Sequence, residues 1–236
     1  MKDYKMNPLW NVLVEVVKGL PKYEEHKAHV RDEILINKPD ITAQELSEAM
    51  SIPLGEAMVI LEELRISHDE VGEELLKELP KPKYRLVALG GTFSKLHYGH
   101  LMLLLTGIRS GEKIIIGVTT DDFAKKLGKR YEVPPYEMRV RKLVEELVKR
   151  EWMDKCVITP IEDPYGVTIE KPEIEVLVTS PYTYFRGSEI NRIRRERGMK
   201  PLEIIVCPLV VAEDGKPISS TRIFLGEVTE TGRIAR

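Results

Sequence analysis

The sequence predicts an α/β protein in which a parallel sheet with crossover helices follows a separate helical domain. From Tyr84 onward, short apolar runs of strand length alternate with longer segments of helical periodicity, the pattern of parallel strands joined by helices. Residues 1–82 instead show apolar residues at helical spacing throughout. Between Arg85 and Ser110, a strand-like run leads through two glycines and two histidines into an apolar run of helical length.

Length and composition are those of a globular protein. The chain has 236 residues, of which 42% are hydrophobic, enough to form a sizeable core. Charged and polar residues follow the first methionine, and no run approaches the roughly 20 apolar residues that a membrane span needs. We therefore expect a soluble, cytoplasmic protein without membrane contacts. Cys156 and Cys207 lack CxxC spacing and lie in apolar runs, which favours buried reduced thiols over a disulfide or a metal site.

Charge is distributed unevenly along the chain, and this indicates a domain boundary. The net charge of the whole chain is −2. Residues 1–82 carry 10 Lys and Arg against 17 Asp and Glu, a net −7, whereas residues 83–236 carry 26 against 21, a net +5. The change falls beside Pro80 and Pro82, in a short stiff segment typical of linkers. We predict a helical domain over 1–82 and an α/β domain over 83–236, whose positive charge suits a small polyanionic substrate.

The most informative part of the helical domain lies between residues 40 and 65. Thr42 and Glu45 form a capping-box pattern at the start of one helix, and Pro53 follows a tight break at the start of the next. This arrangement resembles the helix-turn-helix of winged-helix domains, although a generic helical hairpin has the same pattern. The second helix carries three glutamates against Arg65 alone, so DNA phosphates would repel it. We therefore do not expect nucleic-acid binding, and a homo-oligomer interface, another protein contact or plain packing remain as roles.

The central stretch has the features of a phosphate-binding turn. Leu86–Leu89 has the length and composition of a buried parallel strand, and Gly90 and Gly91, without Cβ atoms, let a phosphate approach the backbone after it. His97 and His100 then fall on one face at the N-terminus of the following helix. That end of a helix offers free amide donors and a partial positive charge, so it suits an anion. A metal site is the alternative, but it needs further ligands that the sequence does not place nearby, so we assign no metal ligands.

Basic residues stand just beyond the ends of two further predicted strands. The run from Lys113 to Thr119 is followed by Lys125 and Lys126, and the run from Ile174 to Thr179 is followed by Arg186. In open α/β sheets, ligands bind at the carboxyl ends of the strands, so these side chains can reach a bound phosphate. The forked guanidinium of arginine matches a phosphate with two hydrogen bonds. The alternative for the lysine pair is a solvated surface position.

A second anion site is predicted near the C-terminus. Leu202–Cys207 is the last strand-like run, and Asp214–Gly215 then predicts a turn. The segment ISSTR at residues 218–222 opens a final helix. Hydroxyl groups at a helix start cap free amides, and together these groups form a nest for an anion.

Together these motifs resemble the H-x-G-H nucleotidyltransferase superfamily, whose fingerprint is a strand, a G-G-T-F-D-x-x-H-x-G-H turn and a helix, with I-S-S-T or I-S-T-T at a later helix start. The chain has GGTFSKLHYGH at residues 90–100 and ISSTR at 218–222. Within the superfamily it most resembles archaeal and eukaryotic phosphopantetheine adenylyltransferases over residues 84–226, through the segments GVTTDDFAKK, PPYEMR, SPYTYFRGSEINRIRRERG and PLEI. Ser94 replaces the usual aspartate, and Tyr182 stands where an acidic residue is expected.

The resemblance implies a fold, a reaction and a set of site residues. The fold is a Rossmann-like parallel sheet whose strand order brings both motifs to one crevice. The reaction is adenylyl transfer from ATP to 4′-phosphopantetheine, which yields dephospho-coenzyme A and pyrophosphate in coenzyme A biosynthesis, with Mg²⁺ between the phosphates. The implied catalytic residues are His97, His100, Lys125 and Lys126, and the implied acceptor-binding residues are Thr92 and Arg186. The implied nucleotide-binding residues are Gly90, Gly91, Thr92, Phe93, His97, Gly99, His100, Ser219, Ser220, Thr221 and Arg222.

Two other functions are compatible with the same residues. A related nucleotidyltransferase that uses CTP, or that acts on nicotinamide mononucleotide, needs the same phosphate-binding groups. The sequence does not identify the residues that bind the base or the rest of the acceptor. In another class, a nucleotide-sensing regulator would combine the helix-turn-helix-like domain with a weakened transferase domain. Ser94 favours the regulator, because a serine hydroxyl fixes such a turn more weakly than an aspartate does.

Overall fold

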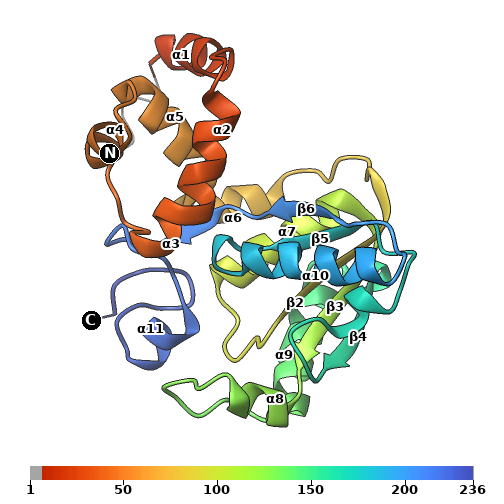
Figure 1. Cartoon of the computed structure of the whole chain (residues 1–236). Coiled ribbons are helices and arrows are strands. Elements are labelled where there is room, and N and C mark those ends of the chain that lie inside the picture. Colours follow the sequence, from red (N-terminus) through yellow and green to blue (C-terminus); the bar gives the residue numbers. More distant parts are fainter. Residues whose placement is uncertain (1–6, 236) are drawn as a thin grey trace. The chain divides into compact units, whose positions relative to one another are not determined.

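The computed structural model describes residues 7–235 and divides the chain into two units, one ending at Ile66 and the other beginning at Ser67. Figure 1 shows helices in the first unit and a sheet with helices in the second. The predicted class, a parallel α/β sheet with a helical N-terminal part, is confirmed. In the described part of the chain, no helix has both the length and the apolar character that crossing a membrane requires.

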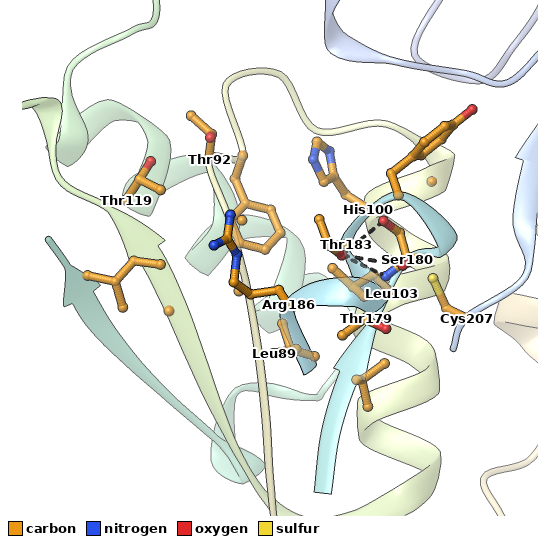
Figure 2. A pocket seen from close by; sticks show the side chains of 18 of the residues that line it. Leu89, Thr92, His100, Leu103, Thr119, Thr179, Ser180, Thr183, Arg186 and Cys207 are labelled. Atoms are coloured by element: carbon orange, nitrogen blue, oxygen red, sulfur yellow. Dashed lines mark hydrogen bonds between the residues drawn. The ribbon is translucent and has the colours of Figure 1, made fainter. Parts of the chain in front are cut away.

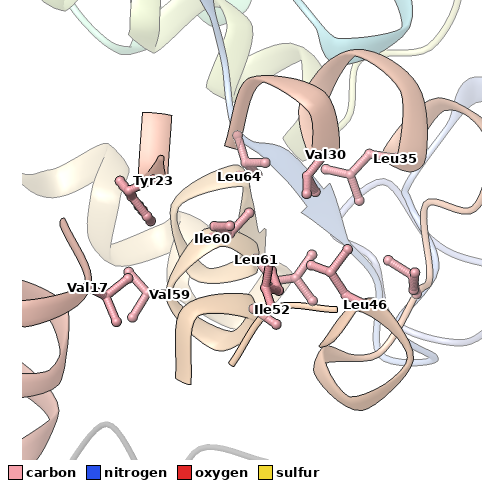
Figure 3. Packing of buried hydrophobic residues seen from close by; sticks show 12 residues of the cluster. Val17, Tyr23, Val30, Leu35, Leu46, Ile52, Val59, Ile60, Leu61 and Leu64 are labelled. Carbon is pink, nitrogen blue, oxygen red and sulfur yellow. The ribbon is translucent and has the colours of Figure 1, made fainter. Parts of the chain in front are cut away.

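The first unit is built from helices around one apolar core. Its helical segments are α1 (Leu9–Lys18), α2 (Tyr23–His29), a π-helical turn (Val30–Ile34), α3 (Leu35–Asn37), α4 (Ala43–Met50) and α5 (Leu54–Leu64), and the short strand β1 (Arg65–Ser67) follows. Each helical segment contributes to the core, among them through Val17, Val30, Leu35, Leu46 and Ile60 (Figure 3). Removal of these side chains from water is the main favourable contribution to folding of this unit.

The pair predicted to resemble a helix-turn-helix corresponds to α4 and α5. The Thr42 hydroxyl accepts a hydrogen bond from the Glu45 amide at 3.2 Å, and the Glu45 carboxylate accepts one from the Thr42 amide at 2.8 Å, which confirms the capping box. Ser51, with a φ of 54°, makes the tight turn between the helices. Most of α5 is buried, including Glu56, whose carboxylate lies 2.7 Å from Nδ1 of His26. A helix enclosed in this way has little surface to place in a DNA groove.

The second unit contains a parallel five-stranded sheet. Its strands are β2 (Tyr84–Gly91), β3 (Gly111–Thr119), β4 (Cys156–Ile161), β5 (Val176–Thr179) and β6 (Glu203–Val206), in the order β4-β3-β2-β5-β6. The main connecting helices are α7 (Tyr98–Ser110), α9 (Tyr136–Lys149) and α10 (Tyr184–Glu196). Shorter elements are α8 (Asp121–Lys126), the 3₁₀ turns η3 (Met153–Lys155), η4 (Gly166–Ile169) and η5 (Pro181–Thr183), the strand β7 (Leu209–Val211) and α11 (Ser220–Phe224).

The strand order reverses direction at β2, because β3 pairs with one side of it and β5 with the other. The register places Gly90 opposite Gly117 and Gly91 opposite Val118, so β2 and β3 end at the same edge of the sheet. In Rossmann-like sheets, the crevice at such a reversal is where ligands bind. The turn that carries both histidines therefore leaves the sheet at the position where a ligand is expected.

The helix α6 (His68–Leu76) belongs to the second unit. It packs against α7, where Arg109 donates hydrogen bonds to the Glu74 carboxylate at 2.9 Å and to the Glu74 carbonyl at 3.0 Å. The boundary predicted after residue 82 therefore differs from the division in the structure, which falls between Ile66 and Ser67. Prolines and a change of charge indicate a linker, but they do not report which element the preceding helix packs on.

We expect a shortened chain that begins at Ser67 to fold, and one that begins at Lys81 to melt at least roughly 5 °C lower. The second chain lacks α6, so Arg109 loses both Glu74 partners and the surface of α7 that α6 covers becomes exposed to water. Thermal unfolding of the two shortened chains, followed by circular dichroism, measures the difference. Equal melting temperatures would show that α6 adds no stability to the second unit.

Candidate active site

A cavity of about 520 Å³ lies at the carboxyl ends of the central strands. Figure 2 shows lining side chains that come from different segments, among them Thr92, His100, Thr119 and Arg186. Within residues 7–235, the lining contains Lys129 and Arg186 but no aspartate or glutamate. The cavity therefore has the charge that suits a polyanionic ligand.

The turn between β2 and α7 has a strained backbone and a closely packed side chain. Phe93 has a φ of 50°, in the left-handed region, which costs a non-glycine residue roughly 1–2 kcal/mol. Its ring is buried and lies 5.0 Å from the His100 ring, centroid to centroid. A Cβ atom on Gly91 would come within 3.2 Å of the Phe93 ring, and one on Gly90 within 3.2 Å of the Gly117 carbonyl oxygen. A side chain at either position would therefore crowd the turn.

The two histidines lie together at the N-terminus of α7. His97 is the N-cap residue, and its Nδ1 accepts a hydrogen bond from the Gly99 amide at 3.1 Å. Because Nδ1 is the acceptor, the proton of the neutral ring is on Nε2, where it can be donated to a ligand. The His97 and His100 rings lie with centroids 3.9 Å apart. Nδ1 of His100 is buried and has no hydrogen-bond partner among the described residues.

Burial makes both histidines weak bases. It lowers the pKa of His100 to about 4, and the positive charge of Lys129 acts in the same direction. It also lowers the pKa of His97 well below the ordinary value, with a further contribution from His100. Both rings are therefore neutral at pH 7 and provide hydrogen-bond donors without a full positive charge.

The ISSTR segment borders the same cavity as the histidines. Ser219, Ser220 and Thr221 all line it. The Ser219 hydroxyl caps α11 by accepting a hydrogen bond from the amide three residues later, at 3.3 Å. The Ser220 hydroxyl donates to the carbonyl of Lys95, in the turn before α7, at 3.4 Å. The two predicted phosphate motifs are thus brought into contact.

Three of the predicted site residues lie away from the cavity: Arg222, Lys125 and Lys126. The Arg222 guanidinium forms ion pairs at 2.5 Å with Asp214 and at 2.9 Å with Glu227, outside the cavity lining. Lys125 and Lys126 lie on α8, and the Lys125 side chain is 78% exposed. For the lysine pair, the structure matches the alternative of a solvated surface position.

The lysine that reaches the cavity is Lys129, which the sequence-based assignment missed. It follows α8 and a turn at Gly128, where φ is 61°. A glycine with positive φ commonly ends a helix and redirects the chain. Gly128 is the feature of the sequence that could have indicated this, because it ends the helix that carries Lys125 and Lys126 and places Lys129 beyond a turn.

Ser94 is buried and makes a specific contact. The Tyr131 hydroxyl donates a hydrogen bond to the Ser94 hydroxyl at 3.2 Å. The Tyr131 ring in turn stacks on Phe224 of α11, with centroids 4.2 Å apart and planes 14° apart. The serine therefore connects the turn after β2 with the loop that carries Lys129, and through this loop with the ISSTR helix.

Arg186 borders the cavity from α10, and Figure 2 shows its guanidinium on the side that holds Thr92. It donates a hydrogen bond to the Glu189 carboxylate at 2.8 Å. Glu189 also accepts a hydrogen bond from the Tyr165 hydroxyl at 2.6 Å. These contacts fix the orientation of Arg186, and one-third of its side chain, 33%, stays exposed. The two residues implied for the acceptor thus line the same cavity.

We expect the free energy of unfolding of the second unit to fall as the pH drops from 6.5 to 4, and to fall less in His100→Asn. Over this range the unfolded state binds a proton at residue 100 that the folded state does not, so folding becomes less favourable as the pH falls. A pKa of about 4 in the folded state against 6.5 in the unfolded state corresponds to a loss on the order of 3 kcal/mol.

The measurement is urea unfolding in a Trp10→Phe background. Trp10 and Trp152 lie one in each unit, so the fluorescence of this background reports on the second unit. Parallel curves of unfolding free energy against pH, with and without the histidine, would contradict the lowered pKa.

Comparisons with known proteins identify a matching family and several similar chains. The cytidylyltransferase-like family matches residues 88–224, which include the histidine turn and the ISSTR segment. Phosphopantetheine adenylyltransferases of Methanopyrus kandleri and Methanothermobacter thermautotrophicus are each 44% identical to this chain, over 64% and 66% of it and over 95% and 93% of their own lengths. A crystal structure of a protein of unknown function from Archaeoglobus fulgidus has a TM-score of 0.46 and 34% identity, over 52% of this chain and 97% of that one. The family match spans more than half of the sequence, and the chain therefore belongs to the cytidylyltransferase-like family of nucleotidyltransferases.

Proposed function

We propose that this chain transfers the adenylyl group of ATP to 4′-phosphopantetheine, yielding dephospho-coenzyme A and pyrophosphate. The observation that carries the proposal is one cavity that combines both phosphate motifs, two cationic side chains and no carboxylate among its described lining residues. The name phosphopantetheine adenylyltransferase, carried by relatives that match over nearly their whole length, supports this choice of substrates.

The acceptor chemistry is consistent with a cavity that lacks a carboxylate. A phosphate monoester has a second pKa near 6 and is largely dianionic at pH 7, so it attacks without needing a strong base. An oxygen of the acceptor phosphate forms a bond to the α-phosphorus of ATP, and the bond from that phosphorus to the oxygen of the departing pyrophosphate breaks. Every species in this reaction is an anion, which a carboxylate in the wall would repel.

The groups on the nucleotide side are assigned to stabilise the leaving pyrophosphate. His97 and His100 are neutral donors at the N-terminus of α7, and the hydroxyls of the ISSTR segment line the same space. Preorganised donors of this kind act where charge develops in the transition state. We assign the positive charge of this side to Lys129 rather than to the pair on α8, which lies outside the cavity lining.

Thr92 and Arg186 are assigned to the acceptor phosphate. Arg186 is already oriented by Glu189, which leaves further N–H groups of its fork for a phosphate. Holding two polyanions in line is the larger part of the task in this reaction class, since little covalent chemistry is left to the protein.

We further propose that Mg²⁺ enters the site with the phosphates of ATP. No group of three His, Cys, Asp or Glu residues between residues 7 and 235 is arranged to hold a metal ion. Magnesium in phosphate-transferring sites is commonly bound through substrate oxygens and water, which suits a cavity lined by hydroxyls and cations. When bound, the ion neutralises part of the charge on the leaving pyrophosphate.

We infer that the reaction takes place in the cytoplasm. We also infer that the first unit provides a protein contact, either with a second copy of the chain or with another protein. The contact is supported by an apolar stripe on α1, where Leu9, Val12 and Val16 have exposed fractions of 69%, 54% and 62%. Contiguous exposed apolar side chains commonly mark protein contacts.

A pyrophosphate-release assay tests the proposed reaction. Purified protein with Mg²⁺ receives ATP or CTP, each combined with 4′-phosphopantetheine or nicotinamide mononucleotide. We expect the pair of ATP and 4′-phosphopantetheine to react at least about tenfold faster than any other pair, a difference of roughly 1.4 kcal/mol. A preference for CTP or for nicotinamide mononucleotide would assign the chain to a related transferase. ATP binding without pyrophosphate release would favour a nucleotide-sensing regulator.

Replacement of Lys129 by methionine should reduce turnover far more than the same replacement of Lys125. Lys129, although exposed, lines the cavity, whereas Lys125 lies on α8 outside the lining. Loss of one group that stabilises transition-state charge costs roughly 100- to 1,000-fold in rate, while loss of a surface ion pair costs little. Steady-state pyrophosphate release by the two variants gives the comparison. A larger loss of turnover in Lys125→Met than in Lys129→Met would support a catalytic role for the lysine pair on α8 instead.

A further inference from the structure

Arg139, in the first turn of α9, is buried and binds three segments around the site. Its Nε donates to the Pro134 carbonyl at 2.7 Å. Its Nη1 donates to the Thr92 carbonyl at 2.8 Å and to the Thr119 hydroxyl at 3.3 Å. Its Nη2 donates to the Asp121 carboxylate at 2.9 Å. One guanidinium thus joins the turn after β2, the end of β3 and the segment that leads into α9.

The arrangement of these acceptors requires an arginine. A guanidinium holds five N–H groups in a fixed planar fork, and here its three nitrogens meet four acceptors. A lysine ammonium is a compact point charge, so it reaches some of these acceptors but does not span them. The Arg139 side chain is 0% exposed, and its one carboxylate partner, Asp121, is 43% exposed. A cation buried to this extent is costly unless its other donors are also bonded, as they are here.

The Thr92 carbonyl connects Arg139 to the strained part of the turn. This carbonyl belongs to the peptide plane between Thr92 and Phe93, and rotation about φ of Phe93 swings it. Phe93 has a φ of 50°, a conformation that persists only where the surroundings fix it. The packed Phe93 ring fixes one side of this peptide, and the hydrogen bond from Arg139 fixes the other.

We propose that Arg139 is a positioning residue for adenylyl transfer, which locks the Thr92–Phe93 peptide and so holds Thr92 against the end of β3. The proposal rests on the function proposed above. Arg139 itself is not among the residues that line the cavity. Its effect passes through Thr92 and Thr119, which do line it.

Loss of the Arg139 hydrogen bonds should reduce turnover and acceptor affinity more than it reduces nucleotide affinity. The hydroxyls of the ISSTR segment lie in a part of the chain to which Arg139 donates no hydrogen bond. A displacement of reacting groups by about 1 Å can cost on the order of 100-fold in rate. A residue that only stabilised the fold would not separate kcat from ATP affinity in this way.

The test compares Arg139→Lys with Arg150→Lys, a matched change at the far end of the same helix. Arg150 pairs with Glu146 at 2.6 Å and does not line the cavity. Pyrophosphate release is measured with each substrate varied, and ATP affinity is measured by calorimetry without acceptor. For Arg139→Lys we expect kcat to fall roughly 100-fold and KM for 4′-phosphopantetheine to rise, with the Kd of ATP within about threefold of the parent. For Arg150→Lys we expect every constant within about twofold.

A kcat of Arg139→Lys within threefold of the parent would overturn the proposal. The proposal would also be overturned if Arg139→Lys weakened ATP binding by as large a factor as it lowered kcat. If circular dichroism shows that Arg139→Lys does not fold, Asp121→Asn decides instead, because it keeps the size of the residue and removes only the counter-charge. A kcat at least about fivefold lower at unchanged ATP affinity supports the positioning role, and an unchanged kcat rejects it. A parent protein that releases no pyrophosphate would refute the proposed function before any variant is compared.

Discussion

The pairing of β2 with both β3 and β5 is the constraint on which the site depends. Parallel strands in register end at one edge, so the turn after β2 and the segments after its neighbours leave the sheet side by side. Hydrogen bonds between strands fix this edge independently of the side chains that later use it. Groups far apart in the sequence then meet: Ser220 donates a hydrogen bond to the carbonyl of Lys95, which precedes it by 125 residues.

Much of the fold could be predicted from the sequence, because the signals that specify it are local. Each strand of the sheet is a short apolar run between polar ends, and the capping box at Thr42 involves residues three positions apart. The histidine turn and the ISSTR segment could be recognised for the same reason, because each is a short continuous motif. Most residues of both motifs line one cavity, which agrees with the crevice expected from the strand order; the exceptions are Lys95, Leu96, Tyr98 and Arg222.

The parts that could not be predicted depend on contacts between distant segments. Lys129 differs from its neighbouring lysines only in the path of the chain after Gly128. Arg222 belongs to the right segment, but carboxylates from outside that motif hold its guanidinium away from the cavity. Arg139 has the sequence context of one more charge on an amphipathic helix, and its burial follows from acceptors that three segments supply. The spacing of residues within one helix or strand does not reveal such contacts between distant segments.

The neutrality of His97 and His100 has a consequence for the end of the catalytic cycle. A neutral N–H group binds a forming negative charge at short range, but it lacks the long-range attraction that a full cation exerts on a finished product. Pyrophosphate carries more negative charge than the adenylyl group from which it departs, so each further cation in the wall would hold it more tightly. With uncharged rings at the helix start, the pocket favours the transition state over the departed anion. Uncharged donors at this position therefore hold the finished product less tightly than cations would, which favours its release.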